Sequence, residues 1–161
     1  MKALVGYDSK YGNTEKLARV IAGELQVHGM TVEAPAISEV GPDALTGIDL
    51  LVIGGPTQAH GMSPGMRAFF KGLGPKSLQS VRAAAFDTRY RKAQLLTGSA
   101  AHKIAGQMGK HGAKVVLPPE SFFVAHAEGP LEDGELERAR RWAATISQAE
   151  AVEREPVAGR S

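Results

Sequence analysis

The chain has 161 residues, of which 43% are hydrophobic and 22% are charged, and this composition is typical of one ordinary globular domain with a sizeable core. It has no cysteine, which excludes disulfides, iron–sulfur clusters and thiol catalysis and makes the cytoplasm the expected location. Its five histidines show no metal-binding spacing, so we predict no metal site. The net charge is only +2, no nucleic-acid-binding motif occurs, and no apolar run approaches 18 residues, so we expect neither nucleic-acid binding nor membrane insertion.

Apolar runs of strand length alternate with amphipathic stretches of helix length from the N-terminus onward. Residues 2–7 predict a buried strand, and residues 14–29 predict a helix that ends at Gly29. The inward face of this helix is expected to carry Leu17, Val20, Ile21 and Leu25. Residues 31–37 then indicate a weaker strand, and residues 48–55 indicate a strong one that is apolar almost throughout.

The middle of the chain continues the same alternation. Residues 62–73 predict a short helix with Ser63 as its N-cap and Pro64 at its first helical position. Residues 82–88 predict the fourth strand, and residues 98–112 predict the helix that follows it.

The last strand and the closing helix complete the pattern. The segments KVVLPP and SFFVAHA predict a fifth strand at a sheet edge or broken in the middle, because Pro118 and Pro119 cannot lie inside a central ladder. Residues 133–149 predict a closing helix. Its inward residues are expected to be Leu136, Ala139, Ala143 and Ile146, with Trp142 beside them. We therefore expect one domain over residues 1–149 and a disordered tail over residues 150–161.

Five βα units whose strands are continuously apolar predict an α/β fold with a parallel sheet covered by helices on both faces. Because crossovers between parallel strands are right-handed, such a chain forms a doubly wound domain. Ligands of these folds bind beyond the carboxyl ends of the strands, at the topological switch point. The loops at 8–14, 55–65 and 88–99 are therefore the candidate site.

The stretch SKYGNT, residues 9–14, joins the first strand to the first helix. A helix N-terminus offers unpaired N–H groups and partial positive charge, which favour a phosphate. Gly12 permits close backbone approach, and Ser9, Asn13 and Thr14 add side-chain donors. Neither a Walker A nor a GxGxxG spacing occurs here, so a monophosphate suits the loop better than a triphosphate. An ordinary βα turn with an Asn or Thr cap is the alternative interpretation.

The sequence resembles the flavodoxin-like FMN-binding family at this loop and beyond it. YDSKYGNTEKLA is similar to the family's phosphate-binding loop, and Tyr11 replaces its usual Ser or Thr, as in flavodiiron-type flavodoxin domains and some quinone reductases. GGPTQAHGMSPGMRAFF and AEGPLEDGELERARRWA resemble the second flavin loop and the entry to the C-terminal helix, so the likeness covers most of residues 2–148. It implies a five-stranded parallel sheet in the order 2-1-3-4-5, in the short form without an insertion in strand five.

The resemblance also implies which residues bind FMN. They are Ser9, Lys10, Tyr11, Gly12, Asn13 and Thr14 of the first loop, Pro56, Thr57, Gln58, Ala59, His60 and Gly61 of the second, and Thr88, Arg89 and Tyr90 of the third. Thr57 is expected to donate to the phosphate or the ring edge, and His60 is the only ring in its loop that can stack on the flavin. Ala59 or Gly61 takes the position at which the family flips a peptide beside flavin N5.

The third loop predicts both stacking and a basic rim. Tyr90 is expected to cover the other face of the ring, with the Arg89 guanidinium as a possible substitute. Across the three loops Lys10, Arg89, Arg91 and Lys92 oppose Asp8 and Asp87. Positive charge near the flavin makes its reduction potential less negative, and a basic rim favours an acidic redox partner or an anionic substrate.

The resemblance implies an FMN flavoprotein that shuttles electrons between redox partners, in which no side chain acts as acid, base or nucleophile. Two alternatives stay open. One is an FMN-dependent NAD(P)H:quinone-type oxidoreductase, whose basic rim attracts the nucleotide. The other is a flavin-free scaffold of the same fold.

Overall fold

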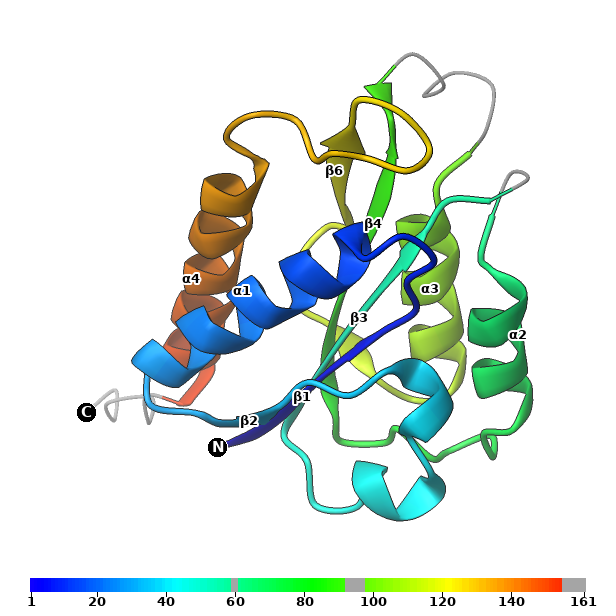
Figure 1. The fold of residues 1–161 in the computed structure, drawn as a ribbon. Coiled ribbons are helices and arrows are strands. Elements are labelled where there is room, and N and C mark those ends of the chain that lie inside the picture. Colours follow the sequence, from blue (N-terminus) through cyan, green and yellow to red (C-terminus); the bar gives the residue numbers. More distant parts are fainter. Residues whose placement is uncertain (59–60, 92–97, 155–161) are drawn as a thin grey trace.

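The computed structural model describes residues 1–58, 61–91 and 98–154, and its core is one parallel sheet between two layers of helices (Figure 1). The strands are β1 (Lys2–Tyr7), β2 (Thr31–Glu33), β3 (Leu50–Pro56), β4 (Arg82–Tyr90), β5 (Lys114–Val115) and β6 (Glu120–Val124). They run in the order β2-β1-β3-β4-β5, with β6 also pairing with β4, and every pairing is parallel. The predicted flavodoxin-like strand order is confirmed.

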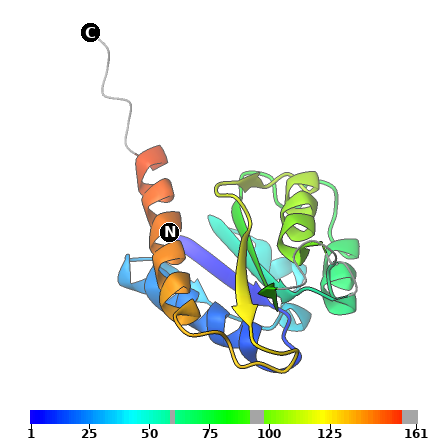
Figure 2. The ribbon, with the colours of Figure 1, turned by 90° about the horizontal axis from the view of Figure 1, so that it is seen from above.

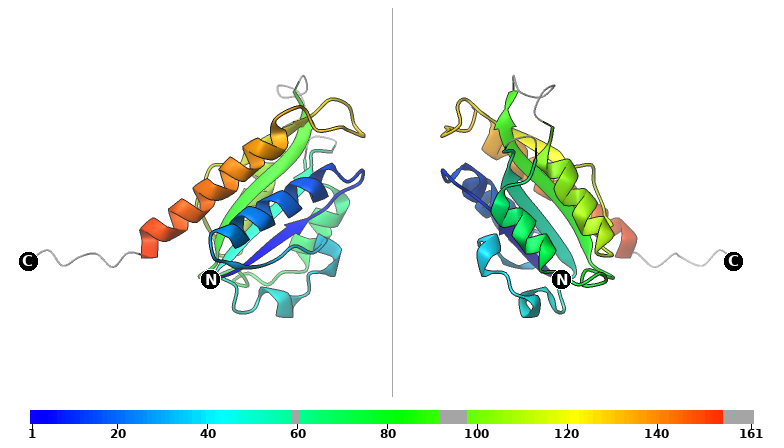
Figure 3. Two further views of the ribbon diagram at one scale, coloured as in Figure 1. Left: turned by 60° about the vertical axis from the view of Figure 1, so that its left-hand side comes forward. Right: turned by 90° about the vertical axis from the view of Figure 1, so that its right-hand side faces the viewer.

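Helices cover both faces of the sheet, as Figures 2 and 3 show. The pair α1 (Asn13–Val27) and α4 (Glu135–Arg154) lies on one face, and the pair α2 (Pro64–Lys71) and α3 (Ala100–Lys110) lies on the other. Two short 3-10 turns, η1 (Ile37–Glu39) and η2 (Pro42–Leu45), connect β2 to β3. No helix in the part of the chain that the structure describes is long and apolar enough to cross a membrane.

The strands are apolar throughout because both faces of the sheet are buried. Successive side chains of a strand point to opposite faces. In β3, Leu50 and Val52 therefore pack in the core under α1 and α4, whereas Leu51 and Ile53 pack in the core under α2 and α3. This two-sided burial is what the continuous apolar pattern predicts.

An aromatic cluster fills the core under α4. The rings of Phe86, Phe122 and Trp142 meet edge to face, with centroids 5.9 to 6.0 Å apart. Gly54 lies opposite Phe86 across the β3–β4 pairing, and a Cβ at Gly54 would stand 2.0 Å from the Phe86 ring. The glycine is therefore what allows the ring to pack against β3.

The second and fifth strands are both shortened at prolines. Pro118 and Pro119 separate β5 from β6, and these two pieces pair with opposite ends of β4, which confirms the predicted broken edge strand. The predicted second strand, residues 31–37, is too long, because β2 ends at Glu33. Pro35 has no N–H for a ladder, although its carbonyl still accepts from the Tyr7 N–H at 3.3 Å.

The first turn of α4 differs from the prediction. Leu136, expected to face inward, is 38% exposed, whereas Glu135 is buried. The Glu135 carboxylate takes the inward position because it accepts a hydrogen bond from the Phe123 N–H at 2.8 Å. Ala139, Ala143 and Ile146 are fully buried, as predicted, and Trp142 is nearly so.

The helix also continues beyond its predicted end at residue 149. Glu150 is buried and pairs with Arg82 Nε at 2.5 Å, and Glu153 pairs with both Arg82 and Lys114. These ion pairs join the last turns of α4 to the beginnings of β4 and β5. Residues 155–161 of the predicted tail lie outside the described residues.

Candidate functional site

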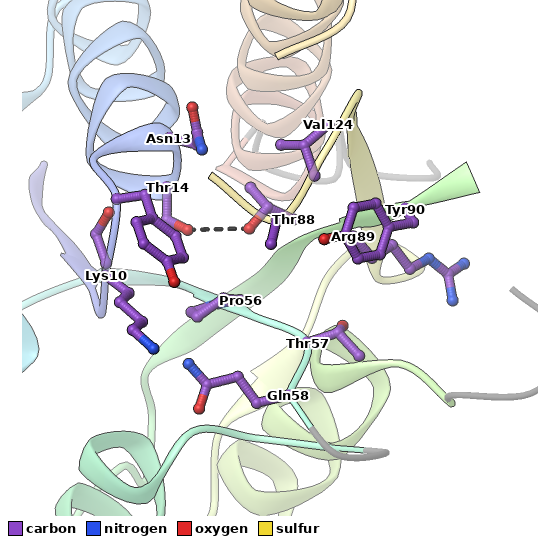
Figure 4. A pocket seen from close by; sticks show the side chains of 13 residues that line it. Lys10, Asn13, Thr14, Pro56, Thr57, Gln58, Thr88, Arg89, Tyr90 and Val124 are labelled. Carbon is purple, nitrogen blue, oxygen red and sulfur yellow. Dashed lines mark hydrogen bonds between the residues drawn. The ribbon is translucent and has the colours of Figure 1, made fainter. Parts of the chain in front are cut away.

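A pocket of about 390 Å³ opens where the carboxyl ends of β1, β3, β4 and β6 meet (Figure 4). It is lined by Ser9, Lys10, Tyr11, Asn13, Thr14, Pro56, Thr57, Gln58, Thr88, Arg89, Tyr90, Val124 and Ala127, and we call it the carboxyl-edge pocket. All of these except Val124 and Ala127 belong to the residue set predicted from the sequence. Its volume is within the range of small-molecule sites.

Four predicted site residues are not among the lining residues. Gly12 lies at the start of α1, where it shapes the backbone. Gly61 closes the second loop, because it exchanges two backbone hydrogen bonds with Gln58 at 2.9 and 2.8 Å. Ala59 and His60 lie outside the described residues.

The N-terminus of α1 has no side-chain cap. Gly12 is the N-cap residue, with φ of +89°, so the Asn or Thr cap that the alternative interpretation expected is not present. The first intrahelical bond is donated by the Lys16 N–H to the Gly12 carbonyl at 3.1 Å. The N–H groups of Asn13, Thr14 and Glu15 therefore have no acceptor within the helix.

Hydroxyl groups of Ser9, Thr14 and Thr88 lie at the start of α1 and along the pocket. Ser9 Oγ accepts from the Gly12 N–H at 3.0 Å, which leaves the serine proton available to a ligand. Thr14 and Thr88, both buried, share a hydrogen bond of 3.2 Å across the pocket, as the dashed line in Figure 4 shows. The arrangement offers several donors and no acidic group to a bound anion.

The two lining residues that sequence reasoning missed lie at or beyond the end of β6. Val124 is the last residue of β6, and Ala127 follows it in the loop that returns to α4. Gly129, with φ of +101°, lets this loop pack on Asn13, since a Cβ there would stand 2.7 Å from Asn13 Oδ1. Because all strands of a parallel sheet end at the same edge, the end of the fifth strand was the signal that could have found them.

Thr57 does not use its hydroxyl toward the pocket. Its Oγ1 donates to Asp87 Oδ2 at 3.1 Å and accepts from the Ala100 N–H at 3.2 Å. The predicted donation from Thr57 to a phosphate or ring edge therefore conflicts with the observed bonds. Thr57 still lines the pocket, next to Pro56 and Gln58.

Two exposed tyrosines line the same pocket. Tyr11 is 48% exposed and Tyr90 is 38% exposed, which is unusual for large rings at the edge of a buried core. The Lys10 ammonium lies 5.2 Å from the centre of the Tyr11 ring. Exposed aromatic surface beside a cavity is typical of a place where a flat ligand binds.

The predicted basic rim is only partly present at the pocket. Arg91 pairs with Glu132 at 2.8 Å and lies over the Phe123 ring, and it does not line the pocket. The hydrogen bond that Arg91 donates to the Glu132 carboxylate raises the pKa of Arg91 above its usual value. Lys92 lies outside the described residues, so Lys10 and Arg89 are the predicted cations that line the pocket.

The acidic residues of the loops accept hydrogen bonds from other groups of the protein. Asp8 accepts a short hydrogen bond from the Ser63 hydroxyl, and Asp87 is fully buried. A further cation lies beside the second loop, because a Cβ on Gly61 would stand 2.7 Å from Lys103 Nζ. The described lining residues thus include cations but no carboxylate.

Comparison with known proteins decides the family. The sequence model of the family described as Flavodoxin matches residues 5–142. The chain belongs to the flavodoxin family. A search of curated proteins found no significant match.

Solved flavodoxins share the fold over nearly their whole length. An archaeal flavodoxin is 26% identical with a TM-score of 0.76, and the alignment covers 95% of this chain and 99% of that one. Oxidised flavodoxin 1 from Bacillus cereus is 23% identical with a TM-score of 0.78, covering 92% and 98%. The likeness to the flavodiiron core of Flv1 from Synechocystis is partial, because the alignment covers 95% of this chain but only 36% of that one, at 15% identity and a TM-score of 0.72.

The residues of the carboxyl-edge pocket fit the flavin that flavodoxins bind. The uncapped start of α1 and the hydroxyls of Ser9 and Thr14 suit a phosphate group. Tyr11, Tyr90 and Pro56 supply apolar surface for a flat ring. The donor set and the aromatic set occupy one cavity, as a molecule with both parts requires.

Proposed function

We propose that the protein binds FMN in the carboxyl-edge pocket and carries electrons between redox partners. The observation that carries this proposal is the uncapped N-terminus of α1, where Gly12 supplies no side-chain acceptor for the first amides. A phosphate supplies the missing acceptors and the negative charge that a helix N-terminus favours. Because the loop has neither a Walker A nor a GxGxxG spacing, a monophosphate suits it better than a longer phosphate chain, and this favours the mononucleotide.

The bound flavin supplies the redox chemistry, since it accepts and releases electrons at its ring. The protein's own residues bind the phosphate, hold the ring and limit the access of water. Tyr90 and Tyr11 are the aromatic side chains that suit the faces of the ring. No described lining side chain is needed as an acid, base or nucleophile.

The charges of the pocket favour an acidic partner or an anionic substrate. Lys10 and Arg89 line the pocket, Lys103 lies beside Gly61, and the nearby Asp8 is bonded to Ser63. Charges at the rim of an encounter surface mainly change the association rate and its salt dependence. In this proposal the protein acts in the cytoplasm.

Flavin titration of the purified protein tests the proposal. The visible bands of a flavin, or quenching of FMN fluorescence by apo-protein at micromolar concentration, are the expected result. Riboflavin, which lacks the phosphate, is expected to bind more weakly than FMN. Absence of binding by both would favour the flavin-free scaffold.

The cations that line the pocket or lie beside it support one alternative function, an NAD(P)H:quinone-type oxidoreductase. Lys10, Arg89 and Lys103 could attract the phosphates of the nucleotide. Steady-state oxidation of NAD(P)H by the isolated flavoprotein separates the two functions. A carrier requires a separate reductase, so rapid turnover without one would contradict the carrier proposal.

A further inference from the structure

Asp87 is a fully buried carboxylate behind the pocket, and neither phosphate binding nor the charge of the rim accounts for it. Its Oδ2 accepts three hydrogen bonds, from the Thr57 hydroxyl at 3.1 Å, the Ser99 hydroxyl at 2.7 Å and the Ala101 N–H at 3.0 Å. The three donors come from the second loop, the end of the third loop and α3. One carboxylate oxygen therefore joins three separate segments.

The same network satisfies the N-terminus of α3. The Ala100 N–H donates to Thr57 Oγ1 at 3.2 Å, the Ala101 N–H donates to Asp87, and the His102 N–H donates to Ser99 Oγ at 3.3 Å. The positive end of the helix offsets the buried negative charge. Thr57 is thus held from both sides, as a donor to β4 and as an acceptor from α3.

We propose that Asp87 is a positioning residue that fixes residues 56–58 to α3 and thereby orients the flavin ring. The proposal rests on the proposed function. Thr57 lies between Pro56 and Gln58, which both line the pocket, and its N–H also donates to the Thr88 carbonyl at 2.9 Å. Residues 56–58, fixed through the backbone and the side chain of Thr57, present a rigid surface to the ring.

The side-chain network around Asp87 includes none of the donors at the phosphate end of the pocket. Its hydrogen bonds involve Thr57, Asp87, Ser99 and the first turn of α3, whereas the donors for a phosphate belong to residues 9–15. Loss of the network should therefore weaken recognition of the ring and leave recognition of the phosphate intact. The difference between FMN and riboflavin measures the phosphate contribution alone.

The test compares Thr57→Val, Thr57→Ser and Asp87→Asn by titration with FMN and with riboflavin. Thr57→Val keeps the shape of the side chain but removes both hydroxyl bonds. Its affinity for both flavins should fall roughly tenfold, as expected for a lost charge-assisted bond, with the ratio of the two affinities unchanged. Thr57→Ser should restore binding, and Asp87→Asn, which keeps one acceptor oxygen, should lose less than Thr57→Val.

Visible circular dichroism of the bound flavin reports the surroundings of the ring, and a loss of protein stability alone would not change it at saturating flavin. The ring bands should change in Thr57→Val and return in Thr57→Ser, at flavin concentrations that saturate each variant. Asp49→Asn is the matched control, because Asp49 accepts from the Lys2 N–H at 2.8 Å at the other end of the sheet, and it should change neither affinity nor spectrum.

The outcomes separate this inference from the function on which it rests. Wild-type affinities and ring bands in Thr57→Val and Asp87→Asn would overturn the positioning role while FMN binding by the wild type stands. A changed FMN-to-riboflavin ratio in Thr57→Val would also overturn it, because the network would then act on the phosphate. If the wild type binds neither flavin, the proposed function fails and this inference fails with it.

Discussion

The N-termini of α1 and α3 lie at the same edge of the sheet and satisfy their amides in opposite ways. At α3, the Ser99 cap, Asp87 and Thr57 supply protein acceptors to the first three amides. At α1, Gly12 supplies no side-chain acceptor. One helix end is thus closed by the protein's own anion, whereas the other is open to the anion of a ligand.

The N-terminus of the short helix α2 is also capped by a protein side chain. Its cap Ser63 accepts from the Met66 N–H at 3.2 Å and donates to Asp8. Of α1, α2 and α3, the described residues therefore leave only α1 without a side-chain cap. The uncapped N-terminus of α1 therefore places the anion-binding end of the pocket at residues 9–15, where the phosphate of a ligand would bind.

The largest expected effect comes from closing the open end. Ser9→Asp places a carboxylate next to the Gly12 N–H, where Ser9 Oγ now accepts at 3.0 Å. Repulsion between this carboxylate and the phosphate should lower FMN affinity by roughly a hundredfold, which is about 3 kcal/mol. Fluorescence titration with FMN measures the loss.

Two comparisons separate charge from distortion of the loop. Ser9→Ala removes the hydroxyl without adding charge and should cost FMN affinity roughly tenfold or less. Riboflavin affinity should be nearly unchanged in Ser9→Asp, since riboflavin carries no phosphate. An equal loss for both flavins would mean that the α1 terminus does not hold the phosphate.

The open end was visible in the sequence because every part of it is local. SKYGNT contains the turn glycine, the hydroxyl and the helix start within six residues, and Ser63 with Pro64 marked the start of α2 in the same way. The strand at residues 2–7 was also predicted from local signals, and Gly29, with φ of +87°, follows the end of α1 at Val27 closely enough to confirm the predicted stop signal. Such local signals can be recognised in the sequence without knowing which distant residues lie nearby in the fold.

The closed end could not be predicted, because its partners are far apart in the chain. Asp87 appeared as a loop charge opposing the basic rim, and only the fold brings Thr57 and Ser99 onto it. The same reason explains the errors in α4, where Glu135 and Glu150 take inward positions because Phe123 and Arg82 lie under the helix. A carboxylate that binds a distant donor looks like an exposed charge in the sequence.

The backbone conformation of Gly12 is expected to keep the N-terminus of α1 open. Gly12→Ala should lower the free energy of unfolding by about 1–2 kcal/mol, because φ of +89° is unfavourable for a residue with a Cβ. A Cβ there meets nothing within 4 Å, so the cost is conformational rather than steric. Gly106→Ala, inside α3, is the matched control and should stabilise by about 0.5–1 kcal/mol. Urea unfolding of the flavin-free protein measures both, and equal signs would contradict the α1 geometry.

The smallest expected effect comes from the charges at the far edge of the sheet, which should act on stability and leave the flavin alone. Hydrogen bonds from Arg82 and Lys114 lower the pKa of Glu153 to about 2, from an ordinary value of 4.5. A carboxyl whose pKa is lowered in the folded state stabilises it fully above pH 4.5, and this contribution is lost as the pH falls through about 2. Glu153→Gln should therefore unfold more easily than the wild type near neutral pH, and the difference between their urea midpoints should shrink between pH 4.5 and 2. FMN affinity at neutral pH should be the same in both, and a loss of affinity in Glu153→Gln would show that the two edges of the sheet are coupled.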